Sequence, residues 1–433
     1  MGGLQLGLAL LNVTDMFQKR SFFKQFQYLL LQVFLVGMAA GSVRTVLPVI
    51  AESEYHLMNN SLVLITALVV AFGLFKALSN IIAGLVSDTI GRKKVLLTGW
   101  ILGIPAPVIL LFSDSWSGVV ICLIFLGINQ GLTWSMTQSA KMDIVQHNRR
   151  GQAMGLNEFS GYLGVAVAGV ATAYMAELFE PRFSLFLFML LMVMLGLVLA
   201  MTTIHDVTLI DKFENGAGES SNQLTKAVGN AGGQTMLAKI YYVSWHNKSL
   251  MALCQAGLVE KFVDSLIWIF YPIYLFQNGL TLPEIGWVVG CYGVVWGGGQ
   301  LFSGWISDHV GRWLPIVSGM FICAFGVILN LFNDGLVWWS MCSVITGGGM
   351  ALLYPNLSAA VADLASSEMR SSALGIYRFW RDLGYMIAAI LFGLTAVIFN
   401  DITSSFVLVF AAMCLSALIL IIYLDVAPNR RLA

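Results

Sequence analysis

The stretch Gly84-Leu85-Val86-Ser87-Asp88-Thr89-Ile90-Gly91-Arg92 occurs a second time, 220 residues further along, as Gly304-Trp305-Ile306-Ser307-Asp308-His309-Val310-Gly311-Arg312. Each copy lies between two long apolar runs, so a membrane-embedded unit has been duplicated. The same offset pairs Gly73 with Gly293, Asp143 with Asp363, Arg150 with Arg370 and Gly155 with Gly375. An offset that is kept from Gly73 to Gly155 indicates two related halves.

The composition places the chain in a lipid bilayer. Of its 433 residues, 58% are hydrophobic and only 11% are charged, which exceeds what a soluble core needs. Lipid offers no partner to exposed backbone groups, so a spanning segment is either a helix of roughly 20 apolar residues or a strand of a closed barrel. The apolar runs are too long and too continuous for barrel strands. We therefore expect an all-α polytopic membrane protein.

Twelve apolar runs are long enough to be spanning helices. They cover about residues 26–50, 61–86, 95–112, 117–140, 152–176, 183–204, 249–276, 285–307, 313–332, 337–362, 372–399 and 402–424. One long polar stretch divides them six and six. We accordingly expect a tail (1–24), a first six-helix bundle (25–204), a linker (205–248), a second six-helix bundle (249–425) and a second tail (426–433).

The Lys and Arg residues between the runs predict the orientation, since cytoplasmic loops carry an excess of them. They gather on one side of the membrane, with Arg182 alone on the other. Both termini are therefore expected to be cytoplasmic, in a multi-pass protein of a bacterial inner membrane. We expect as partners a small-molecule substrate, a proton or other coupling ion and the bilayer itself. There is no nucleic-acid footprint, and we expect a monomer.

Neither a cofactor nor an enzymatic activity is expected. The six cysteines all fall within the apolar runs, where they are interpreted as packing residues, and none of the five histidines does. No nucleophile and base pair and no metal-ligand set stands out in the sequence.

The loop pattern Gly-x-x-x-Asp-x-x-Gly-Arg, between the second and third runs and again between the eighth and ninth, resembles the signature of the major facilitator superfamily. The resemblance covers about residues 25–425. It implies two six-helix bundles related by a pseudo-two-fold axis, which carry a solute by rocking against one another.

Residues at the cytoplasmic helix ends are predicted to latch the bundles together reversibly. Gly84 and Gly91 allow close helix approach and a tight reversal, and Asp88 can accept hydrogen bonds from a helix N-terminus. The resembled family uses acidic and Arg residues at such ends as salt bridges that form in the outward-open state. Ordinary positive-inside charge would not explain the paired Asp residues. The predicted latch consists of Gly84, Asp88, Gly91, Arg92, Asp143, Arg150, Gly304, Asp308, Gly311, Arg312, Asp363 and Arg370.

Ionisable residues inside the runs are the candidates for a transport site, because a charge at bilayer depth is costly and usually faces a water-filled path or a partner. The third, sixth, ninth and twelfth runs contain none, and the resemblance implies that these are the outer helices. The candidate cavity residues are Arg44, Lys76, Asn157, Glu158, Glu260, Lys261, Asp264, Tyr354, Asn356, Arg378, Arg381 and Asp382. Weaker uncharged candidates include Trp134, Tyr162, Trp296 and Gln300.

The repeat offset sets opposite charges at equivalent positions of the two halves. Arg44 corresponds to Asp264, and Glu158 corresponds to Arg378. These residues could pair across a cavity. The alternative is neutralisation within one helix, Arg378 with Asp382 and Lys261 with Asp264, which needs no substrate.

The sequence therefore predicts a secondary active transporter that works by alternating access and is coupled to protons. The basic residues Arg44, Lys76, Arg378 and Arg381 favour an anionic or carboxylate-bearing solute, since Arg binds such groups with two parallel hydrogen bonds. Glu158 and Asp264 are the expected proton carriers, whose protonation would free Arg378 or Arg44 for the solute.

Two alternatives stay open. One is a proton-driven efflux antiporter for drugs or metabolites, although the fifth run, Gly155 to Gly164, lacks the proline that such antiporters usually carry. The other is a non-transporting protein or one of a specialised membrane, such as an ion-related magnetosome-type protein. Intact latch residues in both halves argue against a mere scaffold, which need not switch.

Overall fold

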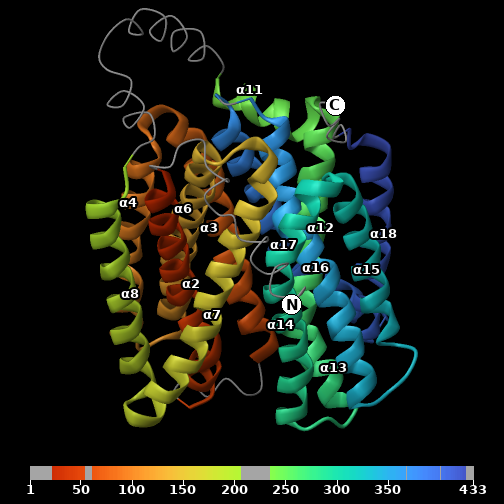
Figure 1. Cartoon of the computed structure of the whole chain (residues 1–433). Helices are drawn as coiled ribbons and strands as arrows, with labels where there is room; N and C mark the ends of the chain where they lie inside the picture. Colours follow the sequence, from red (N-terminus) through yellow and green to blue (C-terminus); the bar gives the residue numbers. More distant parts are fainter. Residues whose placement is uncertain (1–21, 54–60, 206–234, 367, 400, 426–433) are drawn as a thin grey trace, which may run out of the picture.

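The structure is a computed structural model that describes residues 22–53, 61–205, 235–366, 368–399 and 401–425 (Figure 1). The expected N-terminal and C-terminal tails and the middle of the expected linker lie largely outside these residues. In a few described helices the side chains of single residues, Arg44 and Trp268 among them, also lie outside the description.

The described residues fold into two groups of helices that stand side by side (Figure 1). The first group contains α2 (Phe22–Ser53), α3 (Ser61–Ile90), α4 (Arg92–Gly103), α5 (Pro105–Leu111), α6 (Trp116–Ile144), α7 (Arg150–Leu178) and α8 (Pro181–Thr203). The second contains α12 (Lys248–Ser265), η4 (Leu266–Phe270), α13 (Tyr271–Gln277), α14 (Leu282–Val310), α15 (Trp313–Leu329), α16 (Leu336–Leu364), α17 (Arg370–Phe399) and α18 (Thr403–Tyr423). Each of the twelve predicted runs thus coincides with a helix or with consecutive helical segments.

Prolines account for two interruptions that we had not predicted. The third run, expected as one helix over 95–112, is broken at Ile104 and resumes with Pro105 as the first residue of α5. The seventh, expected over 249–276, contains the π-helical turn η4 just before Pro272. A proline supplies no backbone N–H and clashes with the preceding turn, so the regular ladder is lost next to it. In contrast, α16 continues through Pro355.

Polar side chains satisfy helix ends at the surface. At the start of α14, Thr281 and Glu284 form a capping box, in which the backbone N–H and the hydroxyl of Thr281 both donate to the Glu284 carboxylate. These bonds lower the pKa of that exposed carboxyl.

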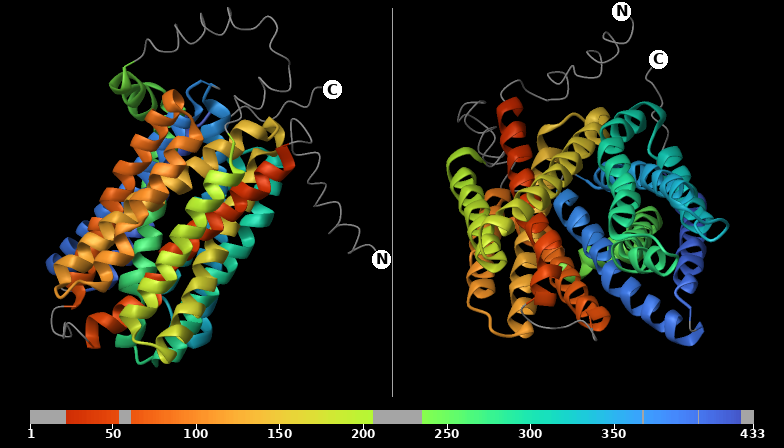
Figure 2. Two further views of the ribbon diagram at one scale, coloured as in Figure 1. Left: turned by 90° about the vertical axis from the view of Figure 1, so that its left-hand side faces the viewer. Right: turned by 90° about the horizontal axis from the view of Figure 1, so that it is seen from below.

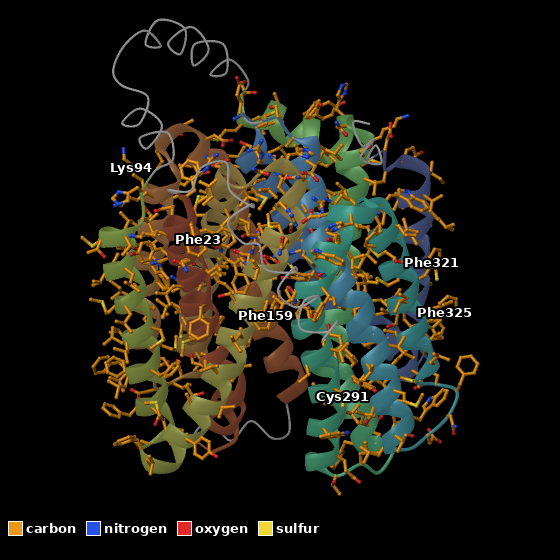
Figure 3. All side chains as sticks on the ribbon, in the orientation of Figure 1. Phe23, Lys94, Phe159, Cys291, Phe321 and Phe325 are labelled. Carbon is orange, nitrogen blue, oxygen red and sulfur yellow. The ribbon has the colours of Figure 1, made fainter. Side chains whose placement is uncertain are left out.

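Two helix pairs make most of the contact between the groups: α3 packs on α17, and α7 packs on α14. We call them the α3–α17 seam and the α7–α14 seam. The helices that contain the charge-free runs lie outside, with α8 and α18 at opposite flanks of the molecule (Figure 2). Phe325 of α15 is also exposed on the outside (Figure 3). Eight of the described helical segments are long and apolar enough to cross a membrane by length and composition.

A short helical segment lies where the expected linker joins the second bundle. It consists of α11 (Met236–Tyr241) and the π-helical turn η3 (Tyr242–His246). The indole of Trp380 on α17 donates to the hydroxyl of Ser244 at 2.9 Å and contacts the ring of Trp245 edge to face. This segment therefore rests on α17.

Candidate functional site

The predicted latch residues gather at one end of the molecule, which we call the latch end. Asp88 of α3 accepts hydrogen bonds from the backbone N–H and the hydroxyl of Ser372, in the first turn of α17. Asp308 of α14 accepts bonds at 2.9 and 2.8 Å from the backbone N–H groups of Gly151 and Gln152, in the first turn of α7. Each Asp thus caps a helix of the other bundle, where the helix dipole favours a negative charge.

The Asp and Arg residues at the helix ends pair across the same boundary. Asp143 of the first bundle lies 3.4 Å from Arg370 of the second. Asp363 of the second lies 3.0 Å from Arg150 of the first. Within each bundle the same Asp also pairs with the signature Arg, at 3.2 Å for Arg92 and 2.9 Å for Arg312. The two halves therefore contribute equivalent three-residue ion networks.

Glycines allow the helices to approach closely beneath these charges. A Cβ atom on Gly84 would lie 2.7 Å from the Cα of Gly375, and one on Gly304 would collide with the carbonyl of Gly151. Gly91 and Gly311 have φ of 95° and 90°, which an L-residue rarely adopts. The loops therefore require glycine for the tight reversal and for the contact between bundles.

A first buried polar network links the two halves at the middle of the helices. The Oε1 atom of Glu158 accepts hydrogen bonds from Trp134, Gln138 and Asn157. Arg378 of α17 donates to Gln138 at 2.6 Å, so one amide bridges this carboxylate and the guanidinium. All five side chains are buried.

The network continues to Asp382, one turn further along α17. Its Oδ2 accepts a bond from Asn80 at 2.6 Å and lies 3.5 Å from the ammonium of Lys76. Its Oδ1 accepts a bond from Arg381 at 3.3 Å. Asn80 also accepts from Arg378, so the α3–α17 seam is polar at this depth.

A second network surrounds Asp264 on α12. Lys261, Tyr292 and Tyr385 donate to its carboxylate at 2.6, 3.1 and 2.8 Å. Glu260, one residue before Lys261, lies 3.5 Å from the same ammonium. At least three donors therefore compensate the charge of Asp264, while the carboxylate of Glu260 accepts no hydrogen bond from the described residues and lies beside one cation.

Tyr354 joins the charges to an aromatic cluster. The Lys261 ammonium lies 4.3 Å from the centre of its ring and the Arg381 guanidinium 4.6 Å, both in cation–π range. Its hydroxyl accepts a bond from Tyr162 of the first bundle at 3.0 Å. The centre of the Trp296 ring lies 4.2 Å from that of Tyr162 and 5.5 Å from that of Tyr354. We call Tyr162, Trp296 and Tyr354 the aromatic triad.

Several buried polar atoms of this region have no hydrogen-bond partner among the described residues. Such atoms are costly unless something binds them, and most of all when they belong to a charged group. They include Nη1 and Nη2 of Arg381, Nη2 of Arg378, Oε2 of Glu158, both carboxylate oxygens of Glu260, Nε1 of Trp296, both amide atoms of Gln300 and Oδ1 of Asn356.

The α7–α14 seam is closed at the latch end and parted at the opposite end. Going away from the latch, Gly155 packs against the carbonyl of Gln300 and Tyr162 against Trp296. Figure 3 shows Phe159 of α7 in the same region, where this helix faces the second bundle. Beyond it, a Cβ atom on Gly297, Gly293, Gly290 or Gly286 would meet no atom within 4 Å. The described side chains therefore form an outward-facing arrangement, if the latch end is cytoplasmic as predicted.

The structure answers the two pairing hypotheses differently. Glu158 and Arg378 do approach one another, but through the amide of Gln138. Asp264 pairs with Lys261 on its own helix, as in the alternative. Asp382 pairs with Lys76 and Arg381 instead of Arg378. Arg44 lies in α2, and its side chain is outside the described residues. The remaining candidate cavity residues are all buried.

Sequence reasoning missed Lys141 and Gln138. Lys141 is fully buried and donates to Asn157 at 2.5 Å, which extends the first network toward the latch end. It lies one residue beyond the predicted fourth run, so we did not count it as intramembrane. The charge itself was a usable signal. Among the described residues no group of three His, Cys, Asp or Glu side chains is arranged to hold a metal.

Two helix bundles that enclose a buried, charged site and are fastened to one another at one end are the architecture of a membrane transporter. Comparison with known proteins gives the family. A family model described as Major Facilitator Superfamily matches residues 29–259 and 253–433. The chain therefore belongs to the major facilitator superfamily and is an integral, multi-pass membrane transporter.

Its similarity to individual proteins is remote. An uncharacterized MFS-type transporter of Methanocaldococcus jannaschii, MJ1560, is 19% identical over 327 residues, which are 75% of this chain and 80% of that protein. The human organic anion transporter MFSD10 superposes with a TM-score of 0.73 at 14% identity, over 92% of this chain and 99% of the other. The proton:xylose symporter XylE superposes with a TM-score of 0.72 at 14% identity, over 93% and 96%. The last two likenesses show the fold alone.

Proposed function

We propose that this protein moves a small anionic solute across the membrane by alternating access, with the proton as coupling ion. The balance of buried charge carries the proposal. The central networks hold five described basic side chains, Lys76, Lys141, Lys261, Arg378 and Arg381, against four acidic ones, Glu158, Glu260, Asp264 and Asp382. An excess of positive charge in a membrane is stabilised by a negative ligand.

The distribution of hydrogen bonds supports the same reading. Each ammonium has a hydrogen-bond acceptor or a carboxylate within 3.5 Å. Among the described residues of the central networks, the cationic N–H groups without a hydrogen-bond partner belong to Arg378 and Arg381, whose planar guanidinium suits a carboxylate or another oxyanion. The organic anion transporter among the structural neighbours is compatible with this class of solute.

Three carboxylates are candidates for carrying the proton. Glu158 and Asp264, the expected carriers, each accept three hydrogen bonds that stabilise the charged form. Glu260 accepts none among the described residues, so it is the carboxylate that loses least by taking a proton. We therefore add Glu260 as the favoured carrier. The proton:xylose symporter among the neighbours is described as proton-coupled.

The experiment is a screen of the purified protein in liposomes that enclose a pH-sensitive dye. Anionic and neutral solutes of similar size are added outside, and solute-dependent proton movement is recorded. We expect anions to move protons and neutral solutes not to. Proton movement with neutral or cationic solutes only would overturn the proposal, and empty liposomes control for leakage of weak acids.

The monomeric state and the location in a bacterial inner membrane are part of this proposal. They are tested by the mass of the detergent-solubilised protein and by membrane fractionation.

A further inference from the structure

The guanidinium of Arg381 is held at its Nε atom, while its two terminal nitrogens have no hydrogen-bond partner among the described residues. Its Nε is bonded to Asp382, and its plane lies against the ring of Tyr354. Nη1 and Nη2 have no partner among the described residues, although the side chain is fully buried. Arg378 differs, because two of its three nitrogens are bonded. Two adjacent, unpartnered N–H groups on one planar cation match the two oxygens of a carboxylate.

Gln300 is the second buried side chain here whose hydrogen-bonding groups lack partners among the described residues. It is fully buried on α14, and neither its amide nitrogen nor its amide oxygen has a partner within the described chain. A single group that both donates and accepts hydrogen bonds satisfies such an amide, and a hydroxyl does so. Gln138 provides the contrast, since its two amide atoms are bonded to Arg378 and Glu158.

Two members of the aromatic triad lie between Arg381 and the part of α14 that carries Gln300. Tyr354 carries Arg381 on its face and contacts Trp296, which lies one helical turn from Gln300 on α14. The indole N–H of Trp296 is itself buried and unpartnered among the described residues. Two aromatic side chains in mutual contact, Tyr354 and Trp296, therefore link the Arg381 guanidinium to the turn of α14 that carries Gln300.

The parted portion of the α7–α14 seam leads to this place. Gly293 and Gln300 are seven residues apart and so lie on the same face of α14. A Cβ atom on Gly293 would meet nothing within 4 Å, and the same holds for Gly297. Open space on this face of the helix thus ends at the amide of Gln300.

We propose that the transported solute is a hydroxylated organic acid, with its carboxylate on the Arg381 fork and a hydroxyl on the Gln300 amide. The inference rests on the proposed anion transport and adds a second, uncharged determinant of specificity. A plain carboxylate leaves Gln300 and the Trp296 indole unmet in the dry interior, whereas a neutral polyol leaves the guanidinium unmet.

The test measures the affinity of the purified, full-length protein by isothermal titration calorimetry for three probes. Gluconate carries both groups, hexanoate carries the carboxylate alone, and sorbitol carries the hydroxyls alone. We expect gluconate to bind at least about tenfold more tightly than either of the others, because each lost hydrogen-bonding group leaves buried partners unpaired.

Two variants assign the determinants. Gln300→Leu keeps the volume and removes the amide, and it is expected to reduce the preference for gluconate over hexanoate to less than about twofold. Arg381→Lys keeps the charge beside Asp382 and removes the fork, and it is expected to weaken gluconate and hexanoate alike by about tenfold or more. Gln255→Leu and Arg182→Lys are the matched controls, since neither Gln255 nor Arg182 belongs to the central networks, and both should bind like the parent.

Each other outcome counts against the inference. Equal affinities for gluconate and hexanoate, an unchanged preference in Gln300→Leu, or no binding of any probe would overturn it while leaving anion transport to the liposome screen. Binding of sorbitol with the affinity of gluconate would overturn both, because the carboxylate would then contribute nothing.

Discussion

Glu260 is the buried carboxylate whose two oxygens receive no hydrogen bond within the described chain, so its replacement separates proton coupling from solute binding. We predict that Glu260→Gln abolishes accumulation driven by a proton gradient but retains exchange of solute for solute. The amide mimics the protonated acid and allows the loaded carrier to turn over. Counterflow and gradient-driven uptake in liposomes measure the two activities.

The matched control is Glu284→Gln, at the exposed start of α14, which should leave both activities unchanged. Glu158→Gln tests whether Glu158 carries the proton instead. If Glu158→Gln loses gradient-driven accumulation but keeps solute exchange, and Glu260→Gln does not, Glu158 is the carrier.

Asp382 has a different role, because Lys76, Arg381 and Asn80 all depend on it. We predict that Asp382→Asn lowers the free energy of unfolding by about 3 kcal/mol, since it leaves buried cations without their counter-charge. Thermal unfolding in detergent measures the change. The double variant Lys76→Met, Asp382→Asn should recover part of the loss. A single variant as stable as the parent would show that Asp382 does not neutralise its neighbours.

At this scale the sequence identified most of the buried ionisable residues but not their partners. Charge in an apolar run is visible directly, and the eight charged candidates whose side chains are described all prove to be buried, while the side chain of Arg44 is not described. The partners depend on side-chain rotamers and on neutral residues that carry no such signal. The bridge from Glu158 to Arg378 through Gln138 is an example.

Among the elements, the helix ends at the latch end are paired so that each bundle holds the other. We predict that Asp363→Asn weakens the closed latch by about 2 kcal/mol, because it removes a charged acceptor from both Arg150 and Arg312. The ratio of closed to open molecules then changes by more than about tenfold. Distances between spin labels on α7 and α14 at the latch end measure this ratio. Reversing the pair, with Asp363→Arg and Arg150→Asp together, should restore closure more than either change alone.

The glycine contact between α7 and α14 allows a steric test of closure at the latch end, alongside the ion-pair test. Since a Cβ atom on Gly304 collides with the carbonyl of Gly151, Gly304→Val should prevent closure at the latch end without unfolding the bundles. We predict loss of transport with normal insertion, measured by uptake and by the elution profile of the purified protein. Wild-type uptake would show that closure there is not needed.

The elements also show where sequence prediction stops. Apolar length and the repeat offset fix where the helices and the latch residues fall, because both depend on spacing alone. The break at Ile104 and the π-helical turn at Leu266–Phe270 depend on how a neighbouring proline is accommodated, which differs from Pro105 to Pro272 to Pro355. The presence of a proline alone does not predict whether the helix breaks, forms a π-helical turn or continues.

For the whole molecule, the glycines at the parted end of the α7–α14 seam are the clearest sign of a second state. If this end closes when the latch opens, Gly290→Leu should permit solute binding in the present state and block transport. Calorimetry and uptake measure the two. Gly348→Leu is the control, because a Cβ atom on Gly348 also meets nothing within 4 Å but shares its face of α16 with exposed Val337, Met341 and Val344. Normal uptake by Gly290→Leu would show that this stretch of α14 never closes.

The difference between the two seams has a mechanical consequence. Gly73 and Gly293 are equivalent by the repeat, yet a Cβ on Gly73 would lie 3.2 Å from the Cβ of Tyr385, whereas one on Gly293 would touch nothing. The helices of the α3–α17 seam are therefore in contact at a level of the molecule where the helices of the α7–α14 seam are already apart. At this level the α3–α17 seam, where Lys76 lies 3.5 Å from Asp382, is thus the closed side of the molecule, and the α7–α14 seam is the open side.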